Sequence, residues 1–397
     1  MFISKLHDVA FVELIKNFLY QNISSKCVFT FSTKQVGPTL QHIDIRHPPL
    51  GDDDIPFQPY GGRYIVTMLP GNGVGPELMR HVEDVIQYIN APIDFEKITI
   101  RDGATLQSDL NNAVTSVKRN GIALKGTIEP NFNSAQYRNP NVEIRNNLDL
   151  FVNITFWKSR AGIKSKYQNI DIVLIRQNTE GEYAMLEHMC KPGVIECLKV
   201  VTQSNTERLA HWAFNYATRY RRRKVTVVHK ANIMKMTDGL FLKTVKQVSK
   251  KYPHIQCNDV IIDNCSMQLI TKPHQFDVIL LPNLYGTVLN NVICGLTGGP
   301  GLTAGANYGH TYAIFEPACR NLGNSLVGQN SANPIAMLNA TISLLFYLKK
   351  KWHAKMLKDA ISKTLLVDNI FTPDLGGNHT TTDVVNKIKE NVSLLYN

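Results

Sequence analysis

Short apolar runs that alternate with helical patterns restrict the fold of this chain more than any other feature. Buried strands read as apolar runs of about 4–8 residues, whereas helices repeat apolar residues every three or four positions. Helical patterns lie between most of the runs, and after the first run Leu78, Val82 and Ile89 mark one helix face. Strands that alternate with helices are typical of an α/β protein with a largely parallel sheet, which is the fold class that we expect. The runs lie at 64–70, 94–100, 121–126, 170–176, 225–229, 259–262, 276–282 and 311–315.

A glycine-rich turn, PGNGVGPE, follows the first run. Its glycines, Gly71, Gly73 and Gly75, do not have the GxGxxG spacing of a Rossmann dinucleotide site, and no acidic residue closes the unit at the required distance. A tight turn between a strand and a helix explains the glycines by itself. The turn is therefore weak support for a nucleotide site.

The net charge of +11 is the main compositional signal, and the densest basic cluster is RYRRRK at 219–224. Excess positive charge can attract nucleic acid, anionic lipid or anionic metabolites. The cluster follows an expected helix at 207–218, where cations suit the carbonyl end of the helix dipole. It lacks the aromatic platforms that proteins use to bind single strands. We expect a solvated helix end and no nucleic-acid partner, with a basic nucleic-acid-binding protein as an alternative.

Cysteine usage and hydropathy exclude two further classes of protein. The seven cysteines form no CxxC pair, which argues against a disulfide framework or a zinc site and for a reducing compartment. The longest uncharged stretch ends in 334–348, which is shorter than the ~20 residues of a membrane span. Ile335, Leu338, Ile342 and Leu345 recur there at helical spacing. We expect a buried core helix and no membrane span.

Residues 1–60 differ from the rest of the chain and are interpreted as a leader and extended segment. Pro, Gly and Asp are frequent after about residue 31, and no periodicity is present. A mitochondrial presequence should be rich in Arg and poor in acids. Residues 1–26 contain no Arg and carry Asp8 and Glu13, so a mitochondrial location rests mainly on the resemblance described next.

Six motifs occur in a fixed order and together are far more specific than any one of them. They are PGNGVGPEL, IRQNTEGEY, VVHKANIMKMTDGLF, FDVILLPNLYG, GGPGLTAGANYG and ANP. In this combination the chain resembles the isocitrate/isopropylmalate dehydrogenases, which are β-decarboxylating enzymes, over roughly residues 61–392. GGPGLTAGANYGH and TPDLGG are similar to the gamma-type regulatory subunits within that family, which belong to mitochondrial NAD-dependent isocitrate dehydrogenase.

The resemblance implies a two-domain fold of the isocitrate/isopropylmalate dehydrogenase type, which is not a Rossmann fold. The large domain would comprise 61–150 and 299–397, and the small domain 151–298 would make the dimer contact. The cleft between the domains would hold the site. The resemblance also implies the mitochondrial matrix as the location.

The family reaction needs a divalent cation, Mg²⁺ or Mn²⁺, which polarises the oxygen of the substrate and takes several hard oxygen ligands. Asp263 matches a metal ligand of the family. The other two ligands should come from the helix after NLYG, four residues apart on one face. Thr287 and Asn291 stand there instead of carboxylates. A cation therefore has little reason to bind to what remains.

The substrate and nucleotide positions are also partly replaced. Arg145 and Arg176 match arginines that hold the substrate carboxylates, but Thr155 stands in place of the arginine between them. Cys319 and Arg320 stand where dehydrogenase subunits carry a His-Gly pair at the adenine.

The proton-transfer residues of the family are retained as Tyr183 and Lys230. In this family each active site is shared across a dimer, and the partner contributes a lysine and an aspartate. The resemblance implies that this chain has no catalytic residues in cis, whereas Lys230 and Asp263 act in trans on a neighbouring subunit that uses NAD. The implied partners are catalytic alpha-type and beta-type subunits in a hetero-oligomer. The alternative is an active metal-dependent dehydrogenase with a remodelled site.

Gamma-type subunits use the corresponding cleft for the effectors citrate and ADP. The resemblance places citrate at Pro130, Val142, Arg145 and Arg176, and ADP at Asn321, Leu322 and Asn333. Pro130, Val142 and Leu322 replace polar residues of the gamma-type pattern. Because each lost hydrogen bond to an ionised group costs about 1.5–3 kcal/mol, we expect a weakened effector response.

Overall fold

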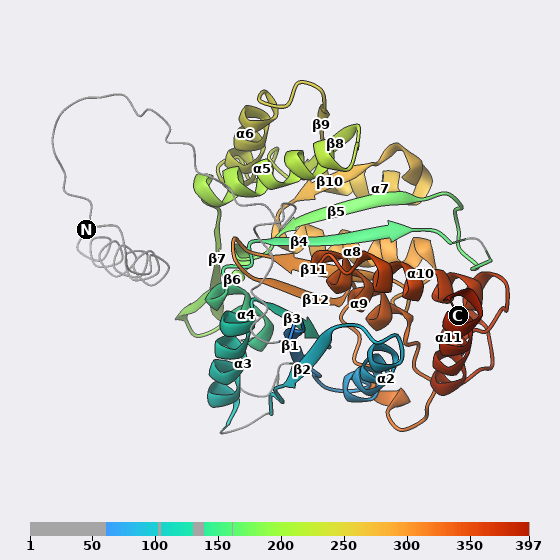
Figure 1. Cartoon of the computed structure of the whole chain (residues 1–397). Coiled ribbons are helices and arrows are strands. Elements are labelled where there is room, and N and C mark those ends of the chain that lie inside the picture. The colour runs from blue at the N-terminus through green and yellow to red at the C-terminus, as the bar shows by residue number, and fades with distance from the viewer. Residues whose placement is uncertain (1–60, 102–104, 130–138, 161, 397) are drawn as a thin grey trace, which may run out of the picture. The chain divides into compact units, whose positions relative to one another are not determined.

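The computed structural model describes residues 61–101, 105–129, 139–160 and 162–396. The leader 1–60 and Pro130 lie outside the described residues. Ten strands form one mixed sheet in the order β2-β1-β3-β12-β11-β4-β5-β10-β8-β9 (Figure 1). A separate hairpin consists of β6 (Gly181–Lys191) and β7 (Val194–Val200). The strands of the large sheet are β1 (Tyr64–Leu69), β2 (Ile93–Lys97), β3 (Ile122–Lys125), β4 (Val152–Lys158), β5 (Asp171–Gln177), β8 (Lys224–His229), β9 (Gln256–Ile261), β10 (Val278–Leu281), β11 (Ala304–Tyr308) and β12 (Ala313–Pro317).

Six of the nine strand pairings in this sheet are parallel, so the expected largely parallel α/β sheet is confirmed. The three antiparallel pairings join β12, β11, β4 and β5 in the middle of the sheet. Neither β4 nor β11 is among the predicted strands. β11 reads AGANY, whose small and polar residues resemble a glycine-rich loop.

Helices cover both faces of the sheet, as the alternation along β5 shows. Val173 and Ile175 pack in a cluster with aromatic residues of α5, whereas Ile172 and Leu174 pack in another cluster with α8. The helices are α2 (Gly75–Tyr88), α3 (Leu106–Asn120), α4 (Pro140–Asn147), α5 (Gln203–Arg219), α6 (Thr237–Ser249), α7 (Ile262–Thr271), α8 (Asn283–Thr297), α9 (Ile335–Tyr347), α10 (Lys351–Leu366) and α11 (Thr381–Tyr396), with short 3₁₀ turns at Pro273–Gln275, Asn324–Leu326 and Pro373–Leu375.

The apolar stretch at 334–348 forms α9, and its core position is confirmed because most of its side chains are buried against β11 and β12. Within the part of the chain that the structure describes, no helix has the length and apolarity needed to cross a bilayer.

The glycine-rich turn between β1 and α2 brings three segments together. Gly71 and Gly73 have φ of 76° and 59°, a region that L residues rarely adopt. A Cβ on Gly73 would lie 2.1 Å from the carbonyl oxygen of Leu322. Asn72 and Val74 donate backbone hydrogen bonds to Thr127 and Leu322 at 2.8 and 2.9 Å. The turn therefore holds the loop after β12 beside the segment after β3.

In the large sheet, the strands of each predicted domain lie next to one another. Strands from 64–125 and 304–317 lie at one end of the sheet, and strands from 152–281 lie at the other. The junction is the antiparallel pairing of β11 with β4. The division into a large and a small domain stays a prediction.

Candidate functional site

A row of polar residues crosses the centre of the sheet, where its strands run antiparallel. The register places Arg176 of β5 opposite Asn153 of β4, and Asn153 opposite Asn307 of β11. Side chains of paired residues on neighbouring strands lie on the same face. The Nε of Arg176 donates to Asn153 Oδ1 at 3.2 Å, and Asn153 Nδ2 donates to Asn307 Oδ1 at 2.9 Å. The register thus builds a continuous polar row.

Arg176 is buried and makes hydrogen bonds only to neutral groups among the described residues. Its Nη1 donates to Asn283 Oδ1 at 2.9 Å and to Thr287 Oγ1 at 2.7 Å. Burial, together with the nearby charge of Arg145, lowers the pKa of Arg176 to about 9. The guanidinium stays protonated at neutral pH without a carboxylate in contact.

Arg145, on α4, is buried, and neither of its terminal nitrogens has a hydrogen-bond partner among the residues that the structure describes. Burial lowers the pKa of Arg145, and the charge of Glu316 opposes that shift. A buried charged donor without an acceptor is strongly unfavourable. An anion that enters between Arg145 and Arg176 would satisfy both guanidinium groups.

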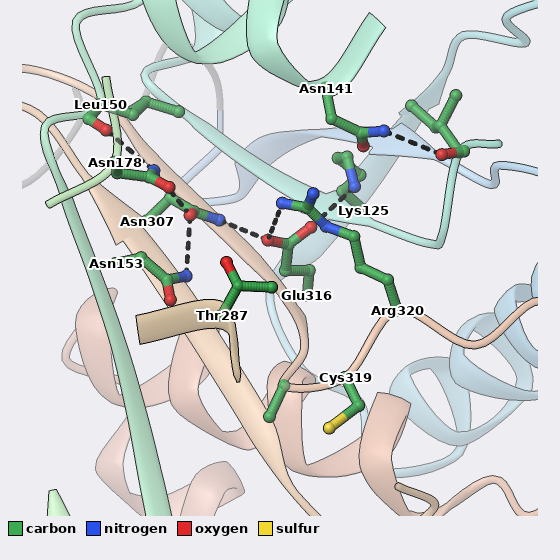
Figure 2. Close-up of polar contacts among 12 residues, drawn as sticks. Lys125, Asn141, Leu150, Asn153, Asn178, Thr287, Asn307, Glu316, Cys319 and Arg320 are labelled. Atoms are coloured by element: carbon green, nitrogen blue, oxygen red, sulfur yellow. Dashed lines mark hydrogen bonds and ion pairs between the residues drawn. The ribbon is translucent and has the colours of Figure 1, made fainter. Parts of the chain in front are cut away.

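The carboxylate that acts on both arginines, Glu316 of β12, is already engaged. Its Oε2 accepts from Lys125 Nζ at 2.7 Å, and its Oε1 accepts from Asn307 Nδ2 at 2.8 Å. Burial alone would raise the pKa of Glu316, but the charges of Lys125 and Arg145 and these hydrogen bonds lower it to about 2. Figure 2 shows Glu316 at the centre of the network, with Arg320 3.8 Å away. The charge of Glu316 therefore mainly balances the charge of Lys125, which is the closer of the two cations.

Thr287 lies on α8, at a position where the sequence resemblance implies a metal-binding carboxylate. Its hydroxyl accepts from Arg176 and, at 2.9 Å, from the phenol of Tyr183. Asn291, one turn later, donates its side-chain amide to the Thr287 carbonyl at 2.9 Å. A divalent cation needs anionic or carbonyl oxygens and is repelled by a guanidinium. Thr287 and Asn291 therefore do not fit Mg²⁺ or Mn²⁺ in this arrangement.

Lys230 and Asp263 form a separate pair. Lys230 follows β8, Asp263 lies in the first turn of α7, and their side chains are 2.8 Å apart. The hydrogen bond from Lys230 lowers the pKa of Asp263. The Asp263 side chain is 69% exposed, so the carboxylate is open to a neighbour. In the described residues no hydrogen bond joins this pair to the arginines or to Tyr183.

Thr155 and Cys319 belong to a closed cluster beneath α8. Thr155 donates to Asn290 Oδ1 at 2.8 Å, and Trp157 Nε1 donates to Thr155 at 3.0 Å. Asn290 Nδ2 donates to Ala318 O at 2.8 Å and lies 3.9 Å from Cys319 Sγ. Thr155 and Cys319 are both buried, so these positions contribute to the packing of α8 against β4 and the segment after β12.

A cavity of about 620 Å³ opens beside the network and includes part of the predicted nucleotide site. Asn321 and Leu322 line it, whereas Asn333 is engaged elsewhere: its amide donates to Asp374 at 2.9 Å, and its oxygen caps α9 at Ile335. Among the described residues the lining consists of Thr127, Ile128, Glu129, Asn139, Asn141 and Arg320, Asn321, Leu322, Gly323, Asn324, Ser325.

Asn141 is a site residue that the sequence reasoning missed. Its Nδ2 donates to Ile128 O at 2.8 Å (Figure 2), while its buried Oδ1 has no partner in the described part of the chain. The neighbouring Val142, which is predicted to be a citrate position, is buried.

Lys125 and Glu316 were also missed, although each is a charged residue at the end of an apolar run. That pattern is the signal that could have identified them.

The fold and the site define an α/β protein in which two buried arginines lie in a polar network, with a cavity beside it. The chain belongs to the isocitrate/isopropylmalate dehydrogenase family, because the sequence model of that family matches residues 65–388. The predicted family and fold class are thus confirmed.

Named relatives and a solved structure agree with this assignment. Isocitrate dehydrogenase [NAD] subunit gamma, mitochondrial, from Homo sapiens is 45% identical over 86% of this chain and 86% of its own length. Isocitrate dehydrogenase [NAD] subunit 1, mitochondrial, from Saccharomyces cerevisiae is 44% identical over 85% of this chain and 93% of its own. The crystal structure of isocitrate dehydrogenase from Methylococcus capsulatus matches with a TM-score of 0.78 at 34% identity, over 83% of this chain and 99% of that chain.

Proposed function

We propose that this chain is a non-catalytic regulatory subunit of the mitochondrial NAD-dependent isocitrate dehydrogenase complex, and that its cleft binds citrate and ADP. The observation that carries the proposal is the pair of buried arginines beside Thr287. The residues that would hold an anion are present, whereas a neutral hydroxyl occupies the position of a metal-binding carboxylate. Relatives whose names identify them as gamma subunits, at 45% identity, support the same role.

The charge balance of the cleft favours a multiply charged anion. Lys125, Arg145 and Arg176 are cationic, and Glu316 is the carboxylate that the network holds between them. The unpartnered nitrogens of Arg145 would donate to one carboxylate of citrate. Arg176 would exchange a hydrogen bond to a neutral oxygen for one to a carboxylate. Charge-assisted hydrogen bonds of this kind contribute about 1.5–3 kcal/mol each.

The cavity beside the network suits ADP. Arg320, Asn321 and Leu322 line the cavity, and Val74 in the glycine-rich turn donates a backbone hydrogen bond to Leu322. Leu322 presents an apolar side chain where the gamma-type pattern has a hydroxyl, so ADP would bind more weakly than in gamma-type subunits. The predicted roles of Pro130 and Val142 in weakening citrate binding belong to the same proposal.

Lys230 and Asp263 would act on a catalytic alpha-type subunit across the dimer contact of the small domain. Asp263 would complete the partner's Mg²⁺ or Mn²⁺ site, and the cation would polarise the substrate oxygen there. The partner would use NAD, and a beta-type subunit would complete the hetero-oligomer in the mitochondrial matrix. The exposure of the Asp263 carboxylate supports a role toward a neighbour.

Co-purification with an alpha-type subunit, followed by calorimetric titration with citrate and ADP, tests the proposal. We expect a stable complex that binds both effectors at sites lost when this chain is omitted. Failure of the two chains to associate, or effector binding to the alpha-type subunit alone, would contradict it.

A further inference from the structure

Large apolar side chains gather at one end of the helical layer, at the termini of four helices. Tyr88 ends α2, Phe346 lies at the end of α9, Trp352 begins α10, and Leu394 and Leu395 lie in the last turn of α11. They are 47%, 44%, 58%, 63% and 45% exposed. We name these five residues the terminal patch.

Contacts between these helices bring together the helix ends that carry the terminal patch. The ring of Trp352 meets that of Tyr396 edge-on at 5.2 Å. Tyr88 forms a hydrogen bond with Ser393. α9 and α10 are joined by three residues, and α10 packs along α11, with the C-terminus at the end of α11 (Figure 1). The ends of the four helices that carry the patch therefore lie near one another.

Three exposed lysines lie on α10, the helix that carries Trp352. Lys351, Lys355 and Lys358 lie on the exposed side of α10 and form no ion pair in the described part of the chain. Of the nearby acids, Asp84 pairs with Lys389 at 2.7 Å, whereas Asp359 keeps its charge while it accepts from the neutral Tyr396 hydroxyl at 2.6 Å, so the three lysines outnumber it. The surface thus combines exposed apolar groups with surplus positive charge.

We propose that the terminal patch binds the surface of an anionic phospholipid bilayer. Tryptophan and leucine side chains insert at the level of the headgroups, and lysines beside them are attracted to anionic lipid. The apolar side chains project from helix termini, which suits a broad lipid surface better than a bound peptide. The proposal depends on this surface alone and stands apart from the function of the cleft.

The chain contains its own reporter for this contact. Of its three tryptophans, Trp157 and Trp212 are buried, and Trp352 is exposed. The full-length chain is mixed with vesicles of phosphatidylcholine, or of equimolar phosphatidylcholine and phosphatidylglycerol. We expect a blue shift of tryptophan emission and co-sedimentation with the anionic vesicles, both weakened by salt. Absence of binding to anionic vesicles would overturn the proposal.

Two charge-reversal variants show whether vesicle binding comes from the terminal patch, from the net charge of the chain or from residues 1–60. Lys351→Glu with Lys355→Glu should lower partitioning at least about 25-fold, since each lysine near an anionic surface contributes about fivefold. Arg221→Glu with Arg223→Glu changes the net charge equally in the other basic cluster and should have little effect. Equal losses in both variants would refute the proposal, as would no loss in the first. Binding to polyglutamate without binding to vesicles would assign the patch to an acidic protein instead.

Discussion

At the scale of single residues, the site is dominated by two buried guanidinium groups that form no hydrogen bond or ion pair with a carboxylate among the described residues. Arg145 lacks hydrogen-bond partners at both terminal nitrogens, and Arg176 contacts only neutral oxygens in the described residues. A buried charge without a counterion costs several kcal/mol. The protein keeps this unfavourable arrangement in the folded state, and binding of an anion would relieve it.

Removing one of these charges should weaken citrate binding. Arg176→Gln keeps hydrogen-bonding capacity toward Asn283 and Thr287 but removes the charge, so citrate affinity should fall about 10- to 100-fold. Calorimetric titration of the reconstituted complex measures the change. Arg223→Gln, an exposed arginine outside the cleft, serves as the matched control. Unchanged citrate affinity in Arg176→Gln would place citrate elsewhere.

Glu316 should make stability depend on pH in the acid range. Its pKa falls from an ordinary 4.5 to about 2 in the folded protein. Because the folded value is the lower one, the stabilisation is complete above pH 4.5 and is lost as the pH falls toward 2. The difference corresponds to roughly 3 kcal/mol.

Denaturant unfolding at a series of pH values checks this dependence. Glu316→Gln should be less stable at neutral pH, because Lys125 is left buried and unpaired, and should lose less stability on acidification. The double variant Lys125→Met with Glu316→Leu should recover much of the loss. The same acid dependence in the wild type and in Glu316→Gln would show that another group titrates.

At the scale of elements, the glycine-rich turn sets the distance between the loop after β12 and the segment after β3. Gly73→Ala would force a Cβ to 2.1 Å from the Leu322 carbonyl oxygen at a φ of 59°. We expect a loss of more than about 2 kcal/mol of unfolding free energy, together with weaker ADP binding. Gly193→Ala is the control, because its φ of 81° is similar but open space surrounds it. Equal losses in the two variants would mean that backbone strain alone is responsible.

Sequence patterns were sufficient for the elements whose apolar residues are continuous. β5 and β10 are apolar runs buried on both faces, and α9 repeats apolar residues at helical spacing. β11 was missed because AGANY buries small residues and an amide instead of large side chains. The family motifs located Arg145 and Arg176. The pairing of Lys125 with Glu316 could not be read from the chain, because 191 residues separate them and only the sheet order brings them together.

At the scale of the whole molecule, the residues expected to bind effectors and the residues expected to act on a partner lie in separate places. Arg176, Thr287 and Tyr183 form one hydrogen-bonded group, whereas Asp263 is largely exposed with Lys230 beside it. That separation suits a division of labour in which one set binds effectors and the other serves a partner.

Substitutions in the exposed set should reduce turnover by the partner without changing effector binding. In a reconstituted heteromer, Lys230→Met and Asp263→Asn should each lower kcat by at least about a hundredfold, the usual contribution of a positioned proton-transfer group. Citrate affinity should stay the same. Lys235→Met, an exposed lysine on the same loop, is the control. Unchanged turnover in the first two variants would refute the role in trans.

The most direct test of the central claim is isocitrate turnover by the chain alone and by its complex with an alpha-type subunit. With NAD and Mg²⁺ or Mn²⁺, the chain alone should show no turnover, since Thr287 and Asn291 provide no carboxylate for the cation. The complex should turn over isocitrate, and citrate with ADP should lower its KM for isocitrate. Metal-dependent turnover by the purified chain alone would contradict the account and favour an active dehydrogenase with a remodelled site.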